Sequence, residues 1–303
     1  MDVVSDAISA VRVGRPSSRR LRVGGRWCTR LAPYEGAGFH VVLAGDCWLL
    51  PDGGGEPVAL GAGDVVLLPH GAGHVLADGP ADAAEVDRAV PFEQLSEPPG
   101  APAGGAVELL CGKYRLDRSR VHPLMAELPE VVHLPDRAGR HPELRAAVDL
   151  LARELDDAAG RPGACLALPS LLDLLLVYMI RAWMTEAATG TWPTVLGDPV
   201  ATTALRALHS DPAAPWSNDR LAAAAGVSRA TLARRFTPLV GRPPMAYLTW
   251  WRLTLAATRL RDTDAPLGTV AREAGYGSPY ALSHAFRREF GVTPGRYRER
   301  LRD

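Results

Sequence analysis

The sequence is poor in cysteine. Its 303 residues include only four, Cys28, Cys47, Cys111 and Cys165, which are scattered along the chain and form no C-x-x-C pair. This spacing excludes the usual zinc-finger arrangements. We expect reduced thiols that pack as small apolar side chains, as is typical of proteins in a reducing compartment.

The sequence also has no long uninterrupted apolar run and no basic N-terminal leader. The longest apolar stretch, residues 171–180, is interrupted by Asp173 and is too short to span a bilayer. Residues 1–10 carry Asp2 and Asp6 and lack the basic region of an export signal. We therefore expect a cytoplasmic protein with no membrane partner.

A net charge is missing as well, with 34 basic and 34 acidic residues, but the two parts of the chain differ. Residues 200–303 contain 16 arginines and 8 acidic residues, which leaves 18 basic and 26 acidic residues in 1–199. A basic half is typical of a domain that binds a polyanion such as nucleic acid. Charge alone does not decide between this interpretation and a solvated surface on which the charges segregate by chance.

Short strand patterns dominate the first 116 residues. Segments rich in Val, Leu and Trp alternate with turn sequences such as DGGGEP (52–57) and PHGAGH (69–74). We expect strands over residues 21–32, 39–44, 46–50, 57–60, 64–68, 74–76 and 106–116, and a loop over 78–105. Many short strands with regular turns predict a small antiparallel barrel or a roll of two sheets.

From Pro142 onward the hydrophobic period changes to that of a helix. After a break at residues 160–163, residues 168–184 predict a second helix that is apolar on most sides. A buried core helix and a dimer seam both explain this second pattern, and we favour the seam. Residues 189–199, TGTWPTVLGDP, are expected to form an interdomain linker.

The last third of the chain contains an internal repeat. Residues 221–247 align with residues 270–297, and equivalent positions lie 49 or 50 residues apart. The matched pairs are Ala222 and Ala271, Gly226 and Gly275, Phe236 and Phe286, Gly241 and Gly291, Pro244 and Pro294, and Tyr247 and Tyr297. Each copy therefore predicts the same local structure.

That local structure is a helix, a sharp turn and a second helix. Gly226 and Gly275 stand where the chain leaves the first helix with a positive φ, which glycine adopts at low cost. Ser228 and Ser278 are placed to cap the second helix. We expect the inward-facing side chains of the second helices to be Leu232, Phe236, Leu282 and Phe286.

The opposite faces of the two second helices are then free. A helix held in this way is the element that enters the major groove of DNA, where its side chains reach base edges and phosphates. A long apolar helix over 243–262 is expected to bridge the copies and hold them about one helical turn of DNA, ~34 Å, apart. The candidate DNA-binding residues are Arg229, Ala230, Thr231, Ala233, Arg234, Pro279, Tyr280, Ser283, His284 and Arg287.

Residues 198–303 resemble the DNA-binding domain of AraC/XylS-type transcription regulators. The segments that carry the resemblance are LAAAAGVSRATLARRF (221–236), GRPPMAYLTWWRL (241–253) and VAREAGYGSPYALSHAFRREFGVTPGRYR (270–298). The resemblance implies base or backbone contacts from both second helices. Ala230 and Ala233 are smaller than the side chains often found at these positions, and His284 replaces a frequent arginine. The first helix is therefore expected to depend more on shape and phosphate contacts.

Residues 1–135 resemble the cupin-type sensor domain found ahead of such a DNA-binding module. The segment GAGDVVLLPHGAGH (61–74) is similar to the second cupin motif, and FHVVLAG (39–45) is similar to the start of the first. The second motif ends at His74, which we expect to point into the barrel. The first motif begins on a strand that carries His40. These two histidines are the leading candidates for ligand binding.

The cupin resemblance raises the question of a metal. Metal-dependent cupins use three histidines and a carboxylate, whereas Val42 takes the place of the second histidine here and no glutamate follows at the usual distance. Two ligands make a weak site, so hydrogen-bonded histidines are favoured over a metal, and no cofactor is expected. Cys28 or Cys111 could supply a third ligand, and the same thiols could sense oxidants.

The sequence as a whole predicts an α+β multidomain protein. We expect a cupin-like sensor domain over residues 1–135, a helical dimerisation segment over 136–190, and an all-α DNA-binding domain with two helix-turn-helix motifs over 198–303. The predicted function is sequence-specific transcription regulation by a homodimer that binds promoter DNA, acts with RNA polymerase and responds to a small-molecule or redox effector. The alternative is a metal-dependent cupin enzyme with a DNA-binding tail. The effector, the operator and the sign of regulation stay open.

Overall fold

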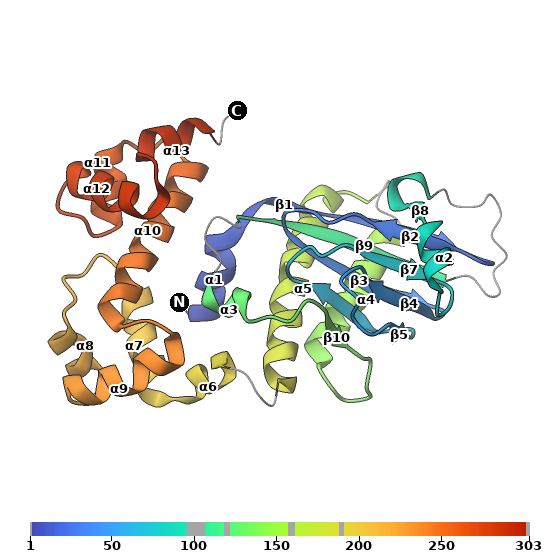
Figure 1. Cartoon of the computed structure of the whole chain (residues 1–303), viewed down its shortest axis with the longest axis horizontal. Coiled ribbons are helices and arrows are strands. Elements are labelled where there is room, and N and C mark those ends of the chain that lie inside the picture. The colour runs from blue at the N-terminus through green and yellow to red at the C-terminus, as the bar shows by residue number, and fades with distance from the viewer. Residues whose placement is uncertain (1, 96–106, 118–121, 157–160, 188–190, 301–303) are drawn as a thin grey trace. The chain divides into compact units, whose positions relative to one another are not determined.

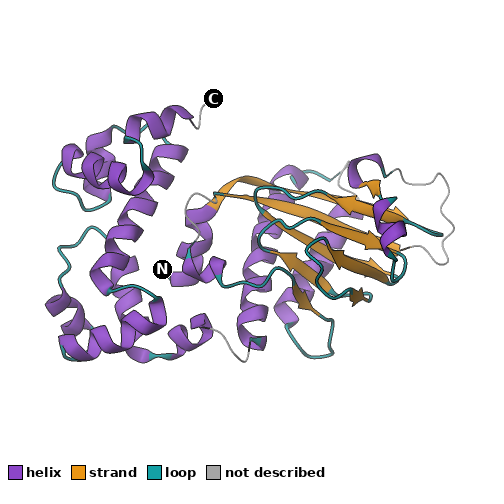
Figure 2. Cartoon of the chain, viewed as in Figure 1, coloured by secondary structure: helices purple, strands orange, loops and turns teal. Residues whose placement is uncertain are grey.

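The computed structural model describes residues 2–95, 107–117, 122–156, 161–187 and 191–300. The chain folds into two compact units (Figure 1, Figure 2). One unit is built mainly from strands and comprises residues 12–119 and 128–186. The other is helical and comprises residues 1–11, 120–127 and 187–303. The chain therefore passes from one unit to the other four times, which the linear domain pattern of the sequence did not predict.

Two five-stranded sheets form the centre of the β unit. The first sheet has the strand order β1 (Arg12–Val23), β9 (Val107–Leu116), β3 (Ala37–Ala44), β6 (Val65–Leu68) and β10 (Val132–Leu134). The second has the order β5 (Val58–Leu60), β4 (Cys47–Pro51), β7 (His74–Ala77), β2 (Cys28–Leu31) and β8 (Val90–Pro91). Neighbouring strands are antiparallel except β2 and β8.

A shared apolar core lies on the inner faces of these strands. It includes Leu21, Val42, Leu49, Val66 and Leu109, all of which are buried. The members come from both sheets, because alternate residues of each strand point to the same side. The expected roll of two sheets is therefore present.

The strand expectations are met for most of the β unit, and the exceptions have a physical cause. β1 begins at Arg12, well before the expected start. Its first half was not predicted, because it is rich in arginine and serine and shows no apolar alternation. Gly25, with φ of +71°, separates β1 from β2, which the sequence merged into one strand. The expected loop also contains α2 (Ala83–Asp87), β8 and the 3₁₀ turn η1 (Phe92–Gln94), while its residues 96–105 lie outside the described part of the chain.

Two helices complete the β unit: α4 (Pro142–Asp156) and α5 (Ala164–Glu186). α5 is attached to the first sheet by two polar contacts. Tyr114 Oη on β9 donates to the carbonyl of Leu172 at 2.6 Å, and Arg12 on β1 forms a 2.5 Å ion pair with Asp173. α5 is also long and apolar enough to cross a membrane, but a single helix of this kind is weak evidence for a membrane span.

The helical unit contains the remaining helices. In chain order they are α1 (Val3–Val11), α3 (Pro123–Ala126), α6 (Thr191–Gly197), α7 (Pro199–Ser210), α8 (Asn218–Ala224), α9 (Arg229–Val240), α10 (Pro244–Asp262), α11 (Leu267–Glu273), α12 (Pro279–Phe290) and α13 (Pro294–Arg300). Within this unit, α10 runs between the α8–α9 pair and the α11–α12 pair (Figure 1). The expected bridging helix is present with almost the expected bounds.

The expectation of an interdomain linker over residues 189–199 is wrong for most of this segment. Residues 191–197 of that segment form helix α6 rather than an extended connection, and residues 189 and 190 lie outside the described part of the chain. Trp192 and Val195 are three residues apart on one helix face and are both buried. The burial of these two side chains stabilises a helix whose glycine, proline and threonine content suggested a loop.

Candidate nucleic-acid interface and ligand pocket

The α8–α9 pair is held by local hydrogen bonds at its turn. The side chain of Ser217 accepts a hydrogen bond from the backbone of Arg220 at the start of α8. Gly226 has φ of +67° and lets the chain reverse. Ser228 then accepts a hydrogen bond from the backbone of Thr231 at 3.2 Å and caps α9. The cap and the glycine set the angle at which α9 leaves the turn.

The α11–α12 pair repeats this arrangement. Gly275 has φ of +74°, and Ser278 caps α12 by accepting a hydrogen bond from the backbone of Ala281 at 3.1 Å. Both second helices end at a glycine in the left-handed region, Gly241 and Gly291. The sequence repeat therefore corresponds to a repeat of local structure.

The two second helices each bury one face and expose the other. Leu232, Phe236, Leu282 and Phe286 are all at most 1% exposed, as the sequence predicts. Eight of the ten candidate DNA-binding residues are exposed: Arg229, Ala230, Ala233, Arg234, Pro279, Tyr280, His284 and Arg287. Thr231 and Ser283 are partly buried. The side chain of Tyr280 is 83% exposed, which is unusual for an aromatic ring without a partner surface.

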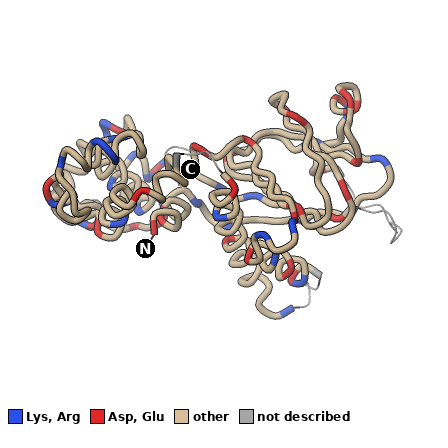
Figure 3. Tube along the Cα trace, turned by 90° about the horizontal axis from the view of Figure 1, so that it is seen from below, with Lys and Arg blue, Asp and Glu red and all other residues tan. Residues whose placement is uncertain are grey.

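The arginines on these helices differ in their acidic partners. Arg229 forms an exposed 3.1 Å ion pair with Asp219, and Arg235 forms a 2.7 Å ion pair with Asp198, the residue that caps α7. Arg234 and Arg287 have no ion-pair partner among the described residues. Basic and acidic residues are interspersed along the chain in both units (Figure 3).

The β unit contains a cavity of about 330 Å³ beside its first sheet. Its lining residues come from strands β1, β2, β3, β7 and β9, from the segment after β2 and from the turn η1. The lining side chains with polar groups are Ser17, Ser18, Arg19, Tyr34, His40, His74, Glu93, Cys111 and Lys113. The size is in the range of sites for small molecules.

His40 and His74 face each other in this cavity, with their Nε2 atoms 2.7 Å apart. His74 Nδ1 lies 3.0 Å from the carbonyl of Ala72, which can only accept, so this nitrogen carries the hydrogen. His40 Nε2 must then donate to His74 Nε2, and His40 Nδ1 is left as an acceptor. That Nδ1 atom is buried and has no hydrogen-bond partner among the described residues.

Burial keeps both histidines uncharged. It is the main cause that places the pKa of His40 well below its usual value, and the neighbouring His74 acts in the same direction. Burial also lowers the pKa of His74, although the Ala72 carbonyl and Asp52 oppose the shift. The pair is therefore a neutral hydrogen-bonded unit near pH 7.

The pair does not fit a cupin metal centre. No group of three or more His, Cys, Asp or Glu side chains suited to a metal occurs among the described residues, so the pair lacks the further ligands of such a centre. Cys111 pairs with His40 across β9 and β3 and lines the same cavity, whereas Cys28 lies elsewhere and contacts the carbonyl of Glu85. The structure thus brings together three of the four candidate ligand-binding residues.

Three thiols, those of Cys28, Cys47 and Cys111, are poor nucleophiles. Burial, followed by Glu85 and Asp78, raises the pKa of Cys28, and burial raises the pKa of Cys47 to about 12. Burial and the nearby Cys47 raise the pKa of Cys111. Because the thiolate is the reactive form, none of these three residues is activated for oxidation.

The cavity also contains residues that the sequence did not single out. Lys113 is the only lysine of the chain, and its ammonium lies 5.7 Å from the centre of the Tyr34 ring. Tyr34 Oη is buried without a hydrogen-bond partner among the described residues. Arg19 lies over the ring of Phe92. The rarity of lysine was the available signal for Lys113, but the position of Tyr34 depends on how distant strands pair.

The β unit contains a cavity, and the helical unit exposes one face of each of two capped helices, an arrangement that is typical of DNA-binding proteins. Two family models agree with this division. A cupin family model matches residues 2–185, and a helix-turn-helix domain model matches residues 221–300. The second range begins within α8 and includes α9, α11 and α12.

Full-length relatives identify the family. The chain is 37% identical over 303 residues to a protein of Streptomyces lividans named as an AraC-like transcription regulator, with 99% of this chain and 98% of the relative covered. It is 35% identical over 302 residues to a protein of the same description from Streptomyces antibioticus, with 99% of each chain covered. The solved DNA-binding domain of AdpA in complex with a target DNA is 36% identical, with 35% of this chain and 94% of that chain covered and a TM-score of 0.33.

The chain belongs to the AraC-like transcription regulators. It is a DNA-binding regulator with a cupin-type N-terminal domain, as the sequence predicted, and not an enzyme. The alternative of a metal-dependent cupin enzyme with a DNA-binding tail finds no support in these relatives.

Proposed function

We propose that this regulator binds promoter DNA through two helix-turn-helix motifs, α8–α9 and α11–α12, and that α9 and α12 are the recognition helices. The observation that carries the proposal is the pair of capped, repeated turns that bury one face of each second helix and expose the other. α10 has 19 residues and is therefore about 28 Å long at 1.5 Å per residue. A rigid helix of this length suits two recognition helices that enter successive major-groove segments.

The exposed side chains divide into two kinds of contact. Arg234 and Arg287 are placed for phosphates, because a guanidinium without an acidic partner gives up no ion pair on binding. Tyr280 and His284 on α12 can reach base edges or thymine methyl groups. Ala230 and Ala233 make α9 a smooth surface, so its contribution comes from close approach and from its arginines.

Selection of binding sites from a random DNA pool and from fragments of the source genome tests this function. The purified full chain should select a common sequence, and its affinity for that sequence should fall steeply with salt. Footprinting should then protect two adjacent major-groove segments on one face of the duplex. Failure to select any sequence would overturn the proposal. Protection of a single segment would overturn the assignment of a second motif.

We propose that the cavity of the β unit holds the effector and that the effector is a small organic anion. Lys113 and Arg19 bring two positive charges and Glu93 one negative charge to a lining whose histidines are neutral. Ser17 and Ser18 add hydroxyl groups to the lining, so the ligand should also carry an O–H or N–H group. Leu31, Pro33 and Phe92 supply apolar contact. Hydroxy- or amino-substituted carboxylic acids have this combination of groups.

The single lysine makes the effector proposal directly testable. Reaction of the full chain with a lysine-selective reagent should modify Lys113 and the N-terminal amine only. A panel of hydroxy and amino carboxylic acids should include members that protect Lys113 and raise the melting temperature, while their neutral amides do neither. Lys113→Met should abolish the stabilisation. Protection by the amides alone would contradict an anionic ligand.

A redox effector is less well supported because burial raises the pKa of both candidate thiols, Cys28 and Cys111. The test is operator binding before and after treatment with hydrogen peroxide. We expect no change that depends on Cys28 or Cys111. A loss of response in Cys28→Ser would favour the redox alternative over the anion.

We propose that the regulator acts in the cytoplasm as a homodimer and that it meets RNA polymerase at the promoter. The exposed apolar side chains of α4 and α5, namely Leu150, Leu166 and Leu174, support the dimer. They lie in the segment 136–190 that the sequence assigned to dimerisation. We also propose that residues 1–135 form the sensor domain and that residues 198–303 form the DNA-binding domain. Transcription in vitro with purified polymerase would decide between activation and repression.

A further inference from the structure

Two segments from the sensor part of the sequence pack inside the helical unit. α1 and residues 122–127, which include α3, belong to this unit together with α7 and α10. Thr258 on α10 donates a hydrogen bond to the carbonyl of Ala10, and the backbone of Trp192 donates to Glu127 at 3.0 Å. The core around the recognition helices is therefore completed by residues that the sequence assigns to the sensor.

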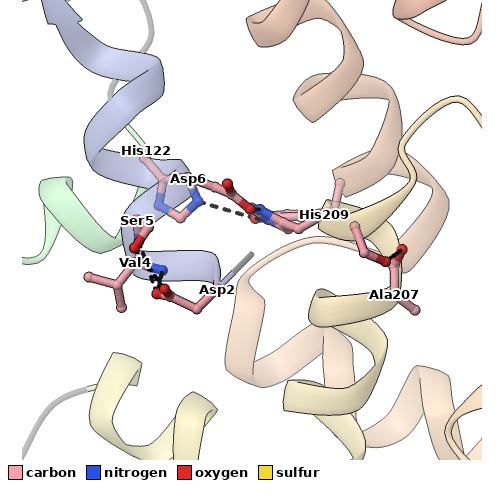
Figure 4. Close-up of polar contacts among 9 residues, drawn as sticks. Asp2, Val4, Ser5, Asp6, His122, Ala207 and His209 are labelled. Atoms are coloured by element: carbon pink, nitrogen blue, oxygen red, sulfur yellow. Dashed lines mark hydrogen bonds and ion pairs between the residues drawn. The ribbon is translucent and has the colours of Figure 1, made fainter.

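The two segments meet α7 and α10 in a buried chain of hydrogen bonds. Figure 4 shows Asp6, on α1, and His122, before α3, next to His209 on α7. Asp6 Oδ2 lies 3.0 Å from His209 Nδ1. Tyr247 Oη, on α10, lies 2.7 Å from His209 Nε2 and 3.2 Å from His122 Nε2. His122, His209 and Tyr247 are at most 2% exposed, and Asp6 is 6% exposed.

The donors and acceptors of this chain are consistent with one direction. The backbone N–H of Leu124 donates to His122 Nδ1 at 3.1 Å, so the hydrogen of a neutral His122 lies on Nε2. Burial keeps His122 neutral by lowering its pKa well below the usual value, and His209 acts in the same direction. His122 then donates to Tyr247, Tyr247 donates to His209, and His209 donates to Asp6. Without α1, His209 Nδ1 would lose its acceptor Asp6, and without residues 122–127, Tyr247 Oη would lose its donor His122.

Tyr247 connects this chain to the first recognition helix. Its ring centre lies 6.0 Å from that of Phe236 on α9, and Phe236 is fully buried. His209 stacks on Trp251 of α10, with ring centres 4.4 Å apart. A shift of Tyr247 or His209 would therefore move the surface on which the buried face of α9 rests, because close-packed cores transmit displacements of this kind.

The same two segments neighbour, along the chain, the strands that line the effector cavity, although residues 118–121 lie outside the described part. α1 ends at Val11 and β1 begins at Arg12, while β9 ends at Leu116, six residues before His122. Arg12 pairs with Leu116, so the two strands leave the sheet side by side. Further along the same pair, Ser17 and Ser18 on β1 and Gly112 and Lys113 on β9 line the cavity.

We propose that Asp6 and His122 are positioning residues for recognition helix α9, and that the β1–β9 strand pair carries the state of the effector cavity to them. A change in the spacing of the two strands at the cavity pulls on α1 and on residues 122–127. The hydrogen bonds to His209 and Tyr247 then break or form together, and α9 follows Tyr247. This inference rests on the proposed function, because it assumes an operator and an effector in this cavity.

A double-mutant cycle on the full chain tests the inference without knowledge of the effector. Tyr247→Phe removes the central hydroxyl and keeps the ring against Phe236. Gly112→Ala acts at the cavity, because a Cβ there would lie 2.3 Å from the Phe39 ring and 2.7 Å from the Ser17 carbonyl oxygen. Operator affinity is measured by fluorescence anisotropy on the selected sequence. We expect the double variant to depart from the product of the single effects by about fivefold or more.

The repeat supplies the matched control. Tyr297 is the equivalent of Tyr247 in the second copy, so Tyr297→Phe combined with Gly112→Ala should multiply to within about twofold. If Gly112→Ala fails to fold, Ser18→Phe, which fills part of the cavity from β1, takes its place in both cycles. The inference is overturned if the effects of Tyr247→Phe and Gly112→Ala on operator affinity are independent. It is also overturned if Tyr297→Phe couples to Gly112→Ala as strongly as Tyr247→Phe does. A wild-type chain that selects no operator would instead overturn the proposed function.

Discussion

The availability of a charged side chain depends on its partners as much as on its exposure. Arg229 and Arg234 are both exposed on α9, yet Arg229 is paired with Asp219 while Arg234 has no acidic partner among the described residues. Arg235, one position further, is paired with Asp198 at the start of α7 and so serves the fold. Three arginines of one helix therefore have different expected roles at the DNA, although they look alike in the sequence.

The first prediction concerns Arg234 and His284. Arg234→Ala should weaken binding to all DNA sequences and lower the salt slope of log Kd by about one, because it removes a phosphate contact. His284→Ala should cost about 1–3 kcal/mol on the selected operator and relax its sequence preference, because it removes a base contact. Anisotropy titrations at several salt concentrations measure both effects.

Arg206→Ala is the control for this prediction. Arg206 is exposed on α7 and lies outside both recognition helices. It should leave the affinity, the salt slope and the sequence preference unchanged. Wild-type affinity in both Arg234→Ala and His284→Ala would mean that the assigned faces of α9 and α12 do not contact DNA.

The second prediction concerns the buried pair His40 and His74. Burial lowers both folded-state pKa values below the usual 6.5, so the unfolded chain binds protons first as the pH falls. The stability contributed by the neutral pair is therefore complete above about pH 7 and is lost progressively below pH 6.5, with a slope of up to about 1.4 kcal/mol per pH unit for each histidine.

Urea titrations of the full chain between pH 8 and 5.5 measure this dependence. His40→Gln, which cannot be protonated, should show a shallower loss of stability on acidification than the wild type. An equal slope in both proteins would show that His40 does not stay neutral in the folded state.

The exposed and buried faces of α9 and α12 could be predicted from the sequence because a helix orders its side chains locally. The period of 3.6 residues separates Leu232 and Phe236 from Arg234 without any knowledge of the rest of the fold. Tyr34, Arg19 and Lys113 could not be predicted, because they meet only after strands far apart in the sequence pair in a definite register.

At the scale of elements, the two turns have the same sequence logic but different surroundings. A Cβ on Gly226 would meet nothing within 4 Å, whereas a Cβ on Gly275 would lie 2.8 Å from Ala213 Cα and 2.9 Å from Arg252 Nε. Arg252, on α10, also donates to the carbonyls of Pro212 and Ala214. The segment before α8 is thus joined to the turn of the second motif, which helps to hold the two motifs in one arrangement.

The third prediction compares the two glycines. Gly226→Ala should cost about 1–2 kcal/mol of unfolding free energy from its positive φ alone. Gly275→Ala should cost about 1–3 kcal/mol more, because the methyl group also overlaps the backbone of Ala213. Chemical denaturation of both variants measures the difference. Equal costs would show that the segment at Ala213 moves away freely.

Elements with a clear period were predicted well, and those without one were missed. α5, α10 and most strands of the two sheets have apolar patterns that identify them. The first half of β1 and helix α6 have no such pattern. Pairing with β9 stabilises the first half of β1, and the burial of Trp192 and Val195 stabilises α6. Contacts with distant segments determine their structure.

At the scale of the whole molecule, the order of segments along the chain differs from their grouping in space. The sensor sequence contributes α1 and residues 122–127 to the helical unit. A fusion or truncation at residue 135 would therefore separate the DNA-binding helices from part of their core. A fragment that starts at residue 198 lacks Asp6, His122 and the burial that they provide.

The fourth prediction concerns assembly. Leu166 is 70% exposed and Leu174 is 38% exposed on α5, and burial of such side chains in a dimer contributes about 1.5–3 kcal/mol each. The double variant Leu166→Glu with Leu174→Glu should shift a dimer to monomer in sedimentation equilibrium and weaken operator binding. Val90→Glu, at a similarly exposed apolar residue on β8, should leave the dimer intact. A monomeric wild type would contradict the proposed seam.

The sequence by itself determined the two capped helix pairs, their inward and outward faces, the two-sheet β domain and the histidines of its cavity. These features follow from local periods, caps and turn residues, whose physics acts over a few residues. Only the tertiary structure decided that His40 and His74 bond to each other and that Lys113 and Tyr34 share their cavity. It also placed Asp6 and His122 against His209 and Tyr247. Those contacts join residues up to 203 positions apart, and their geometry depends on strand register and on the packing of distant segments, which no local pattern encodes.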